Sequence, residues 1–267
     1  MPDANDATVL LDIRDDIAHI ILNRPGAMNA LNLEMAKELL DAAMRCDETT
    51  GVRAVVIVGA GKTFCAGGDV KRFNTETESE QLPTYVRAIT TYLHAAISAL
   101  ARMNAPVIAA VEGSAAGGGM SLALACDLVI AAESAHFTAA YTRIGLCPDG
   151  SMTYSLARLV GVRRALELTL TNRTLSAPEA LDWGIVTAVA PDGEALLRAD
   201  ELAHQLAQGP TLAYGATKRL IHAGWSETLE TQMMAESQAI STMAGTADAR
   251  EGMAAFLARR APEFKGK

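Results

Sequence analysis

Two glycine-containing segments each follow a short run of β-branched and apolar residues. They are Phe64-Cys65-Ala66-Gly67-Gly68-Asp69 and Gly113-Ser114-Ala115-Ala116-Gly117-Gly118-Gly119-Met120. Glycine has no Cβ, so a ligand oxygen can approach the backbone amides closely. The second segment also opens a predicted helix, whose first amides lack intrahelical acceptors and carry the positive end of the dipole. The pattern indicates amides that bind a ligand oxygen, although two plain tight turns would show the same spacing.

A third segment, Leu146-Cys147-Pro148-Asp149-Gly150, places a carboxylate directly before a predicted helix that starts at Ser151. Such a carboxylate can act as a general acid or base when burial tunes its pKa. Aspartate is also a favoured N-cap residue. On the residues alone, both interpretations of Asp149 stay open. Tyr141 could donate a hydrogen bond to Asp149 or to a bound intermediate, and an ordinary half-buried tyrosine is the alternative.

Spacing excludes several other chemistries. The segment around Gly61-Lys62-Thr63 lacks the first glycine of a phosphate-binding loop, because that position is Val56 in a predicted strand. No G-x-G-x-x-G connects a strand to a helix with an acidic residue beyond, which argues against a dinucleotide fold. Ser121 has no His and Asp arrangement that would make it a nucleophile. We therefore expect neither a cofactor nor a metal.

Composition narrows the function classes further. The net charge of −8 argues against a nucleic-acid binder, which needs a basic surface. No apolar run is long enough for a membrane span, and residues 1–6 lack the pattern of a secretory signal. The cysteines have no C-x-x-C pair and no histidine at ligand spacing, so we expect reduced, mostly buried thiols of a cytoplasmic protein. These cysteines are Cys46, Cys65, Cys126 and Cys147.

Periodicity predicts the elements that carry these segments. A hairpin is expected over residues 8–14 and 17–24, which Asp15-Asp16 separates. Buried strands are expected over 53–58, 107–111 and 128–131, and helices over 33–46, 83–103 and 120–125. Residues 74–81 are polar and acidic without periodicity, which predicts a mobile surface loop.

The order of these elements predicts the architecture. Strands and helices alternate through the first part of the chain, which favours an α/β fold with parallel pairing. After about Pro191 the pattern becomes helical, with helices expected over 194–208, 211–222, 227–243 and 247–259. We expect an α/β core over 1–190 and a helical region over 191–267 that is suited to oligomerisation.

The sequence resembles the enoyl-CoA hydratase/isomerase (crotonase) family over nearly its whole length. The resemblance rests on several matching stretches, each weak alone and specific together. They are Leu22-Asn23-Arg24-Pro25, the segment 64–69, Pro106-Val107-Ile108-Ala109-Ala110-Val111, Ala116-Gly117-Gly118-Gly119, Cys126-Asp127-Leu128, Ile144-Gly145-Leu146, Phe256 and Lys265-Gly266-Lys267.

By that resemblance, the backbone amides of Gly68 and Gly118 form an oxyanion hole for a thioester carbonyl. The resemblance implies an acyl-CoA substrate, no separate cofactor, and a spiral of repeated ββα units that assembles as a homotrimer or dimer of trimers. It implies the following substrate- and CoA-binding residues: Arg24, Met28, Ala66, Gly68, Asp69, Val70, Gly117, Gly118 and, towards a neighbouring subunit, Lys265.

A thioester carbonyl held by two amides becomes enolate-like, so a nearby base can remove its α-proton. Hydratases of the family use two glutamates to hold a water, and the corresponding positions here are Ser121 and Tyr141. The absence of both carboxylates argues against that mechanism. Ring-type and dienoyl-CoA isomerases of the family place a catalytic aspartate at the position of Asp149. The resemblance therefore favours an enoyl-CoA isomerase, with the isomerases of ring-containing phenylacetyl-CoA derivatives as the best match.

Other activities of the family stay open. The chain also resembles 4-chlorobenzoyl-CoA dehalogenases, notably over residues 154–158 and 161–175. By that resemblance, Asp149 would be a nucleophile and His94 a base, whereas the plain interpretation of His94 is a surface or packing residue. Those enzymes carry a tryptophan at the position of Tyr141, and this chain departs from that pattern. An atypical hydratase and a non-catalytic acyl-CoA-binding protein are further alternatives.

Overall fold

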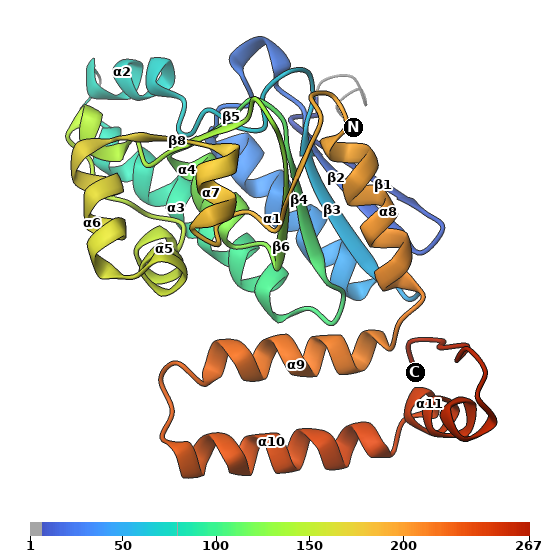
Figure 1. Cartoon of the computed structure of the whole chain (residues 1–267). Helices are drawn as coiled ribbons and strands as arrows, with labels where there is room; N and C mark the ends of the chain where they lie inside the picture. The colour runs from blue at the N-terminus through green and yellow to red at the C-terminus, as the bar shows by residue number, and fades with distance from the viewer. Residues whose placement is uncertain (1–6, 79) are drawn as a thin grey trace.

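The computed structural model describes residues 7–78 and 80–267 (Figure 1). The chain begins with the predicted hairpin, in which β1 (Val9–Arg14) pairs antiparallel with β2 (Ile17–Leu22). Asp15 and Asp16 form its turn with φ angles of 50° and 63°. A two-residue turn with two positive φ angles matches the twist of a hairpin, and aspartate tolerates this conformation.

A six-stranded sheet forms the centre of the molecule. Its strand order is β1-β2-β3-β4-β6-β9, and every pair after the hairpin is parallel. The added strands are β3 (Ala54–Gly59), β4 (Val107–Val111), β6 (Leu128–Ala132) and β9 (Ala188–Ala190). All residues of β3 and β4 are buried, as expected for apolar runs covered on both faces.

Helices on the two faces of the sheet supply that cover. Helix α1 (Leu33–Glu48) packs on β1 and β2 and against α3 (Leu82–Arg102), while α8 (Ala195–Ala207) packs on β3, β4 and β6. A second sheet of order β5-β7-β8 lies beside the first and consists of β5 (Ser114–Ala116), β7 (His136–Thr138) and β8 (Thr174–Ser176). The expected α/β class is confirmed.

The remaining helices of this part are short. They are η1 (Pro25–Ala27), α4 (Gly118–Leu124), η2 (Tyr141–Ile144), α5 (Met152–Val160), α6 (Val162–Thr171) and α7 (Ala177–Asp182). Helix α4 is buried over its whole length. Its first residue, Gly118, therefore lies at a fixed point of the core.

The mobile loop predicted over residues 74–81 is wrong for most of that segment, because α2 spans Val70–Glu78. The helix begins directly after Asp69, whose Oδ1 accepts a hydrogen bond from the Arg72 amide at 3.2 Å. Arg72 also forms an i,i+4 ion pair with Glu76. No residue of α2 is buried, and its only large apolar side chains are Val70 and Phe73 near its start, which is too few for a hydrophobic period to show over residues 74–81. Ser79 lies outside the described residues.

Three helices end the chain: α9 (Thr211–Ala223), α10 (Leu229–Ala244) and α11 (Ala247–Ala258). Helices α9 and α10 run antiparallel below the sheet, and α11 follows at the end of this layer (Figure 1). The buried Lys218 ammonium anchors α9, donating to Asp127 Oδ2 at 2.7 Å and to the carbonyls of Leu100 and Ala105. The division of the chain at residue 190 stays a prediction, and α8 of the helical region packs on the sheet.

No helix in the described part of the chain is long and apolar enough to cross a membrane.

Candidate active site

The two glycine segments lie side by side. Cys65 and Ala115 form a parallel bridge, in which the Cys65 amide donates to Ser114 O and the Ala116 amide to Cys65 O. Three residues beyond each bridge partner stand Gly68 and Gly118. The bridge therefore brings together the two amides that the sequence singled out.

Both amides are left without a protein acceptor. Leu31 pairs with Gly68 through bonds to the carbonyl of Gly67 and the amide of Asp69, so the Gly68 N–H faces away from Leu31. Gly118 is the first residue of α4 and has no intrahelical acceptor. Within residues 7–78 and 80–267, neither N–H donates a hydrogen bond to another residue. Two free donors at one edge can bind a single oxygen.

Neighbouring side chains pack closely against both glycines. A Cβ at Gly68 would lie 2.7 Å from the Phe73 ring, and a Cβ at Gly118 would lie 2.6 Å from Leu31 Cδ1. Real Cβ atoms essentially never approach other heavy atoms this closely. A larger residue at either position would therefore have to shift the Phe73 ring, the Leu31 side chain or its own amide.

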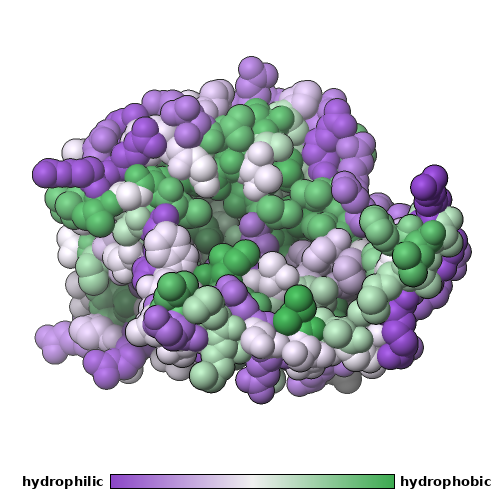
Figure 2. Space-filling model, turned by 60° about the horizontal axis from the view of Figure 1, so that its bottom comes forward, coloured by the Kyte–Doolittle hydropathy of each residue, from purple (hydrophilic) through white to green (hydrophobic). Residues whose placement is uncertain are grey.

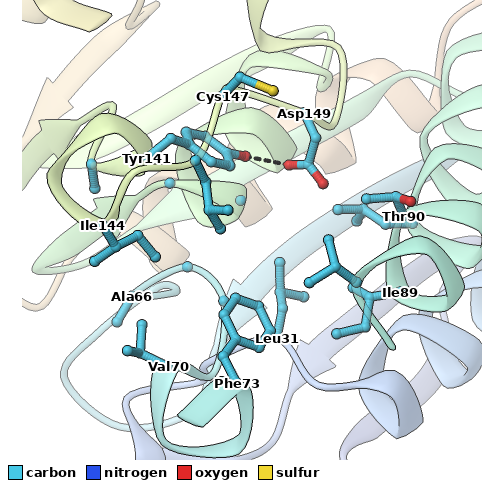
Figure 3. Close-up of a pocket in the computed structure, with 18 of the residues that line it drawn as sticks. Leu31, Ala66, Val70, Phe73, Ile89, Thr90, Tyr141, Ile144, Cys147 and Asp149 are labelled. Atoms are coloured by element: carbon cyan, nitrogen blue, oxygen red, sulfur yellow. Dashed lines mark hydrogen bonds between the residues drawn. The ribbon is translucent and has the colours of Figure 1, made fainter. Parts of the chain in front are cut away.

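Gly68 and Gly118 open into a pocket of about 360 Å³ (Figure 3). Its walls come from α2, α3 and the segment 140–149, and most of the side chains are apolar. The lining side chains include Leu31, Val70, Phe73, Val86, Ile89, Leu93, Ile144 and Leu146, with Thr90, Tyr141, Arg143, Cys147 and Asp149 as polar members. An apolar pocket with a few convergent polar groups is typical of a small-molecule site.

Asp149 lies in this pocket beside Tyr141. The Tyr141 hydroxyl donates to Asp149 Oδ1 at 2.5 Å, and the other carboxylate oxygen points away from Tyr141 towards the pocket (Figure 3). Burial, and then the nearby Asp149 carboxylate, raises the pKa of Tyr141 far above its usual range. Tyr141 therefore keeps its proton and remains a donor. The N-cap interpretation of Asp149 is wrong, because the N-cap of α5 is Ser151.

The main chain of Asp149 is held from two sides. Ser121 Oγ donates to the Asp149 carbonyl at 2.9 Å and lies 2.8 Å from the Tyr141 hydroxyl. The Gly150 amide donates to His94 Nε2 at 3.0 Å. His94 is thus close to Asp149 in the fold, but its Nε2 lone pair is already used, and His94 is not among the residues that line the pocket.

The predicted CoA-binding residues fall into two groups. Ala66, Gly68, Val70, Gly117 and Gly118 line the pocket. The others lie outside its lining.

In that second group, Arg24 pairs with Asp69 at 2.9 Å and also donates to the carbonyl of Ala30, while the Met28 side chain is 60% exposed. The Lys265 amide donates to Asp248 of α11, in the C-terminal segment that lies far from α2 in Figure 1. Within one chain, the structure does not bring Lys265 to the pocket.

The α3 wall of the pocket was not among the site residues predicted from the sequence. Val86, Ile89, Thr90 and Leu93 recur at helical spacing on one face of α3, and all four line the pocket. That periodicity was visible in the sequence as a helix signal. Core packing gives the same signal, so it could not identify a binding wall.

Glu112 accepts hydrogen bonds from the amides of Gly193 and Ala195 at the start of α8, so its role is structural. All four cysteines are free thiols. In the described ranges, no group of three or more His, Cys, Asp or Glu side chains could hold a metal ion.

Comparison with known proteins decides the family. The model of the enoyl-CoA hydratase/isomerase family matches residues 12–267. The chain belongs to this family. The resemblance inferred from the sequence motifs is therefore confirmed, and acyl-CoA thioesters are the substrates on which the family acts.

Relatives within the enoyl-CoA hydratase/isomerase family have different activities. The chain is 36% identical to a 1,2-epoxyphenylacetyl-CoA isomerase of Escherichia coli (strain K12), over 97% of this chain and 98% of that protein. It is 37% identical to 4-chlorobenzoyl coenzyme A dehalogenase-2 of Arthrobacter sp., over 97% and 94%. The relatives thus include both activities that the sequence suggested, the isomerase of a ring-containing acyl-CoA and the 4-chlorobenzoyl-CoA dehalogenase.

The fold agrees with this assignment. The crystal structure of an enoyl-CoA hydratase from Polaromonas sp. JS666 superposes with a TM-score of 0.92 at 35% identity, and the match covers 96% of this chain and 99% of that one. The expected crotonase-like fold is confirmed. Isomerase, dehalogenase and hydratase therefore share one scaffold, and the residues of the pocket must distinguish them.

Proposed function

We propose that the protein is an enoyl-CoA isomerase, in which Asp149 moves a proton between two carbons of a thioester held by Gly68 and Gly118. One observation carries the proposal. A single carboxylate, Asp149, lines the same apolar pocket as Gly68 and Gly118, and its second oxygen has no protein partner among the described residues. The two positions that hold glutamates in hydratases of the family are Ser121 and Tyr141.

The reaction balances with these groups. The two amides donate to the thioester oxygen, and the Asp149 carboxylate takes the proton from the α-carbon of a 3-enoyl-CoA. The electron pair of that C–H bond spreads over the dienolate, whose negative charge the amides stabilise. Asp149 then returns the proton to the γ-carbon, and the double bond moves from the β,γ to the α,β position. The aspartate ends as a carboxylate, ready for another turnover.

The pocket suits an apolar acyl group. Ile89, Leu93 and Phe73 line it. Arg143, the one basic side chain among its described lining residues, donates to the carbonyl of Asn172. A volume of about 360 Å³ has room for a ring or a medium alkyl chain. Either acyl group would fit a place in fatty-acid or aromatic-acid metabolism.

Dehalogenation of an aryl-CoA is the second candidate, supported by the relative from Arthrobacter sp. and by a carboxylate that could serve as nucleophile. Two observations count against it. His94 would have to act as the base, yet its Nε2 accepts the Gly150 amide. Tyr141 also stands where those enzymes carry tryptophan.

An activity screen of the wild-type enzyme distinguishes the candidates. We expect conversion of 3-enoyl-CoA to 2-enoyl-CoA, followed by the absorbance of the conjugated thioester. Chloride release from 4-chlorobenzoyl-CoA, with an aryl adduct in the intact mass, would replace the proposal by the dehalogenase. Hydration of 2-enoyl-CoA as the main activity would indicate an atypical hydratase. CoA binding without any turnover would indicate a binding protein.

We also propose self-association through the C-terminal helices, as a homotrimer or dimer of trimers. The apolar side chains of this region are strongly exposed in the single chain, among them Ile221, Leu229, Met234, Ile240, Phe256 and Leu257 at 62–83%. Figure 2 brings this side forward and shows clusters of hydrophobic side chains at its surface. Large exposed apolar patches are typical of interfaces. Light scattering on the purified protein measures the assembly, and a monomer at micromolar concentration would contradict it.

A further inference from the structure

One peptide unit of the site is bonded at both ends by side chains. The carbonyl of Asp149 and the amide of Gly150 belong to the same peptide bond. Ser121, from α4, donates to that carbonyl, and His94, from α3, accepts from that amide. Because a trans peptide directs its C=O and N–H to opposite sides, the two side chains grip the unit from two directions.

The protons in this cluster can be assigned. A carbonyl only accepts, so the 2.9 Å contact uses the single Ser121 proton, and the contact from Ser121 Oγ to Gly117 O is longer, at 3.3 Å. Ser121 Oγ therefore faces the Tyr141 hydroxyl as an acceptor, at 2.8 Å. Tyr141 then has two acceptors for its proton, Ser121 Oγ and Asp149 Oδ1. The Tyr141 hydroxyl can donate to Asp149 when that carboxylate is charged. It can donate to Ser121 Oγ when Asp149 is protonated and neutral.

The state of His94 follows in the same way. A backbone N–H only donates, so Nε2 must be the unprotonated ring nitrogen, and a neutral His94 carries its proton on Nδ1. His94 acts here as an acceptor towards the main chain.

Gly150 makes the close contact possible. Its φ is +57°, and a Cβ at this position would lie 2.8 Å from Ser121 Cβ. Ser121 itself is fully buried. Glycine is thus the residue that lets the peptide unit settle against Ser121 and reach His94 at the same time.

We infer that Ser121 and His94 are positioning residues, which together hold the Asp149–Gly150 peptide unit so that Asp149 presents its free oxygen to the substrate. The inference rests on the proposed isomerase function. It assigns a role to Ser121 at a position where hydratases of the family use a glutamate, and it gives His94 a role other than base. Misplacing a reacting group by about 1 Å can cost a factor of about 10² in rate.

The test compares variants that remove the two contacts one at a time. Ser121→Ala removes the donor, His94→Leu removes the acceptor, and His94→Gln supplies a side-chain oxygen in its place. His136→Leu is the matched control, because His136 is an exposed histidine on β7 outside the pocket. The readouts are kcat, KM, and the fraction of solvent deuterium in the 2-enoyl-CoA product when the reaction runs in D₂O. The last is a ratio, so a loss of folded enzyme leaves it unchanged.

We expect Ser121→Ala and His94→Leu to lower kcat about 10- to 100-fold with KM within about twofold, since Asp149 acts on the reacting carbons. A loosely held Asp149 exchanges its proton with water before returning it, so deuterium incorporation rises above the wild-type value. In His94→Gln, kcat and the deuterium content both return part of the way to the wild-type values. His136→Leu matches wild type in both. Unchanged kcat and deuterium content in both removal variants would overturn the inference. A lower kcat without a change in deuterium content would also overturn it, as a merely structural effect.

Hydrogen exchange of the Gly150 amide, followed by NMR, separates this inference from the proposed function. We expect slow exchange in wild type and in His136→Leu, and faster exchange in His94→Leu. If the wild type shows this protection but isomerises no enoyl-CoA, the proposed function fails. If the wild type isomerises the substrate but the Gly150 amide exchanges freely, the inference that His94 holds the Asp149–Gly150 peptide unit fails.

Discussion

Tyr141 Oη lies 2.5 Å from Asp149 Oδ1 and donates its proton to that carboxylate. The same hydroxyl lies 2.8 Å from Ser121 Oγ. By the family resemblance, Tyr141 and Ser121 stand at the positions of the two glutamates with which hydratases of the family hold a water. In this protein neither position supplies a carboxylate. Both side chains instead form hydrogen bonds to Asp149, Tyr141 to its side chain and Ser121 to its carbonyl.

Replacing Tyr141 with phenylalanine tests this support. Tyr141→Phe removes the donor to Asp149 and leaves the ring in place, so we expect kcat to fall about tenfold with little change in KM, because a hydrogen bond to a charged group contributes about 1.5–3 kcal/mol. Steady-state kinetics measures both values. A wild-type kcat would show that Asp149 needs no partner at Oδ1.

The raised pKa of Tyr141 predicts a pH effect on stability. In the unfolded chain, tyrosine ionises near about pH 10, whereas the folded state retains the proton. Above that pH the unfolded state therefore binds fewer protons, and the free energy of unfolding decreases as pH rises. Urea unfolding between pH 8 and about pH 11 should show a steeper decrease for wild type than for Tyr141→Phe. Parallel curves would contradict the assignment.

Gly118→Ala tests the geometry of the oxyanion hole. The added Cβ would lie 2.6 Å from Leu31 Cδ1, so either the buried Leu31 side chain or the amide must shift. We expect a shift of the amide, which would lower kcat by a factor of up to about 10²–10³. Leu31→Val removes the colliding methyl group, and the double variant should recover part of the loss. The Leu31→Val single variant is the control. Equal activity of Gly118→Ala and wild type would show that the Leu31 side chain yields and the amide stays in place.

Cys147 should be the reactive thiol. Its side chain is exposed at the pocket, whereas burial raises the pKa of Cys46 and Cys65 to about 12 and also raises that of Cys126. Iodoacetamide at pH 8 should label Cys147 first, and a saturating acyl-CoA should slow that labelling. Peptide mass spectrometry identifies the site. Labelling of a buried cysteine at the same rate would contradict the burial pattern.

Lys218 should matter for stability more than for catalysis. Lys218→Met leaves the Asp127 carboxylate without its ammonium, and breaking such a buried pair costs about 3–5 kcal/mol. Adding Asp127→Asn removes the orphaned charge and should restore part of the loss. Urea unfolding at a fixed protein concentration measures the free energy. A loss below about 1 kcal/mol would mean that α9 is held by other contacts.

Much of the fold could be predicted because its elements have simple sequence patterns. Strands such as Ala54–Gly59 are continuous apolar runs, and the Asp15-Asp16 turn separates two β-rich stretches. Helix α2 escaped prediction because it buries no residue and is stabilised by Asp69 and by i,i+4 pairs. Neither feature produces a hydrophobic period.

The site was predictable to a different degree. The positions of the glycines after two buried strands indicated that the amides near Gly68 and Gly118 could bind an oxygen. The family resemblance identified that oxygen as a thioester carbonyl. The contacts of Ser121 and His94 with the Asp149–Gly150 peptide could not be foreseen, because they involve main-chain atoms that every sequence contains. Only the tertiary structure brings α3 and α4 to the same peptide bond.

The most direct measurement follows double-bond migration by the Asp149→Asn variant. Asparagine has nearly the same shape and can still accept from Tyr141, but it cannot take a proton from carbon. The account predicts that wild type converts 3-enoyl-CoA to 2-enoyl-CoA, and that Asp149→Asn binds the thioester with similar affinity while converting it at least about 10³-fold more slowly. Conversion by Asp149→Asn at the wild-type rate would contradict the central claim that Asp149 carries the proton.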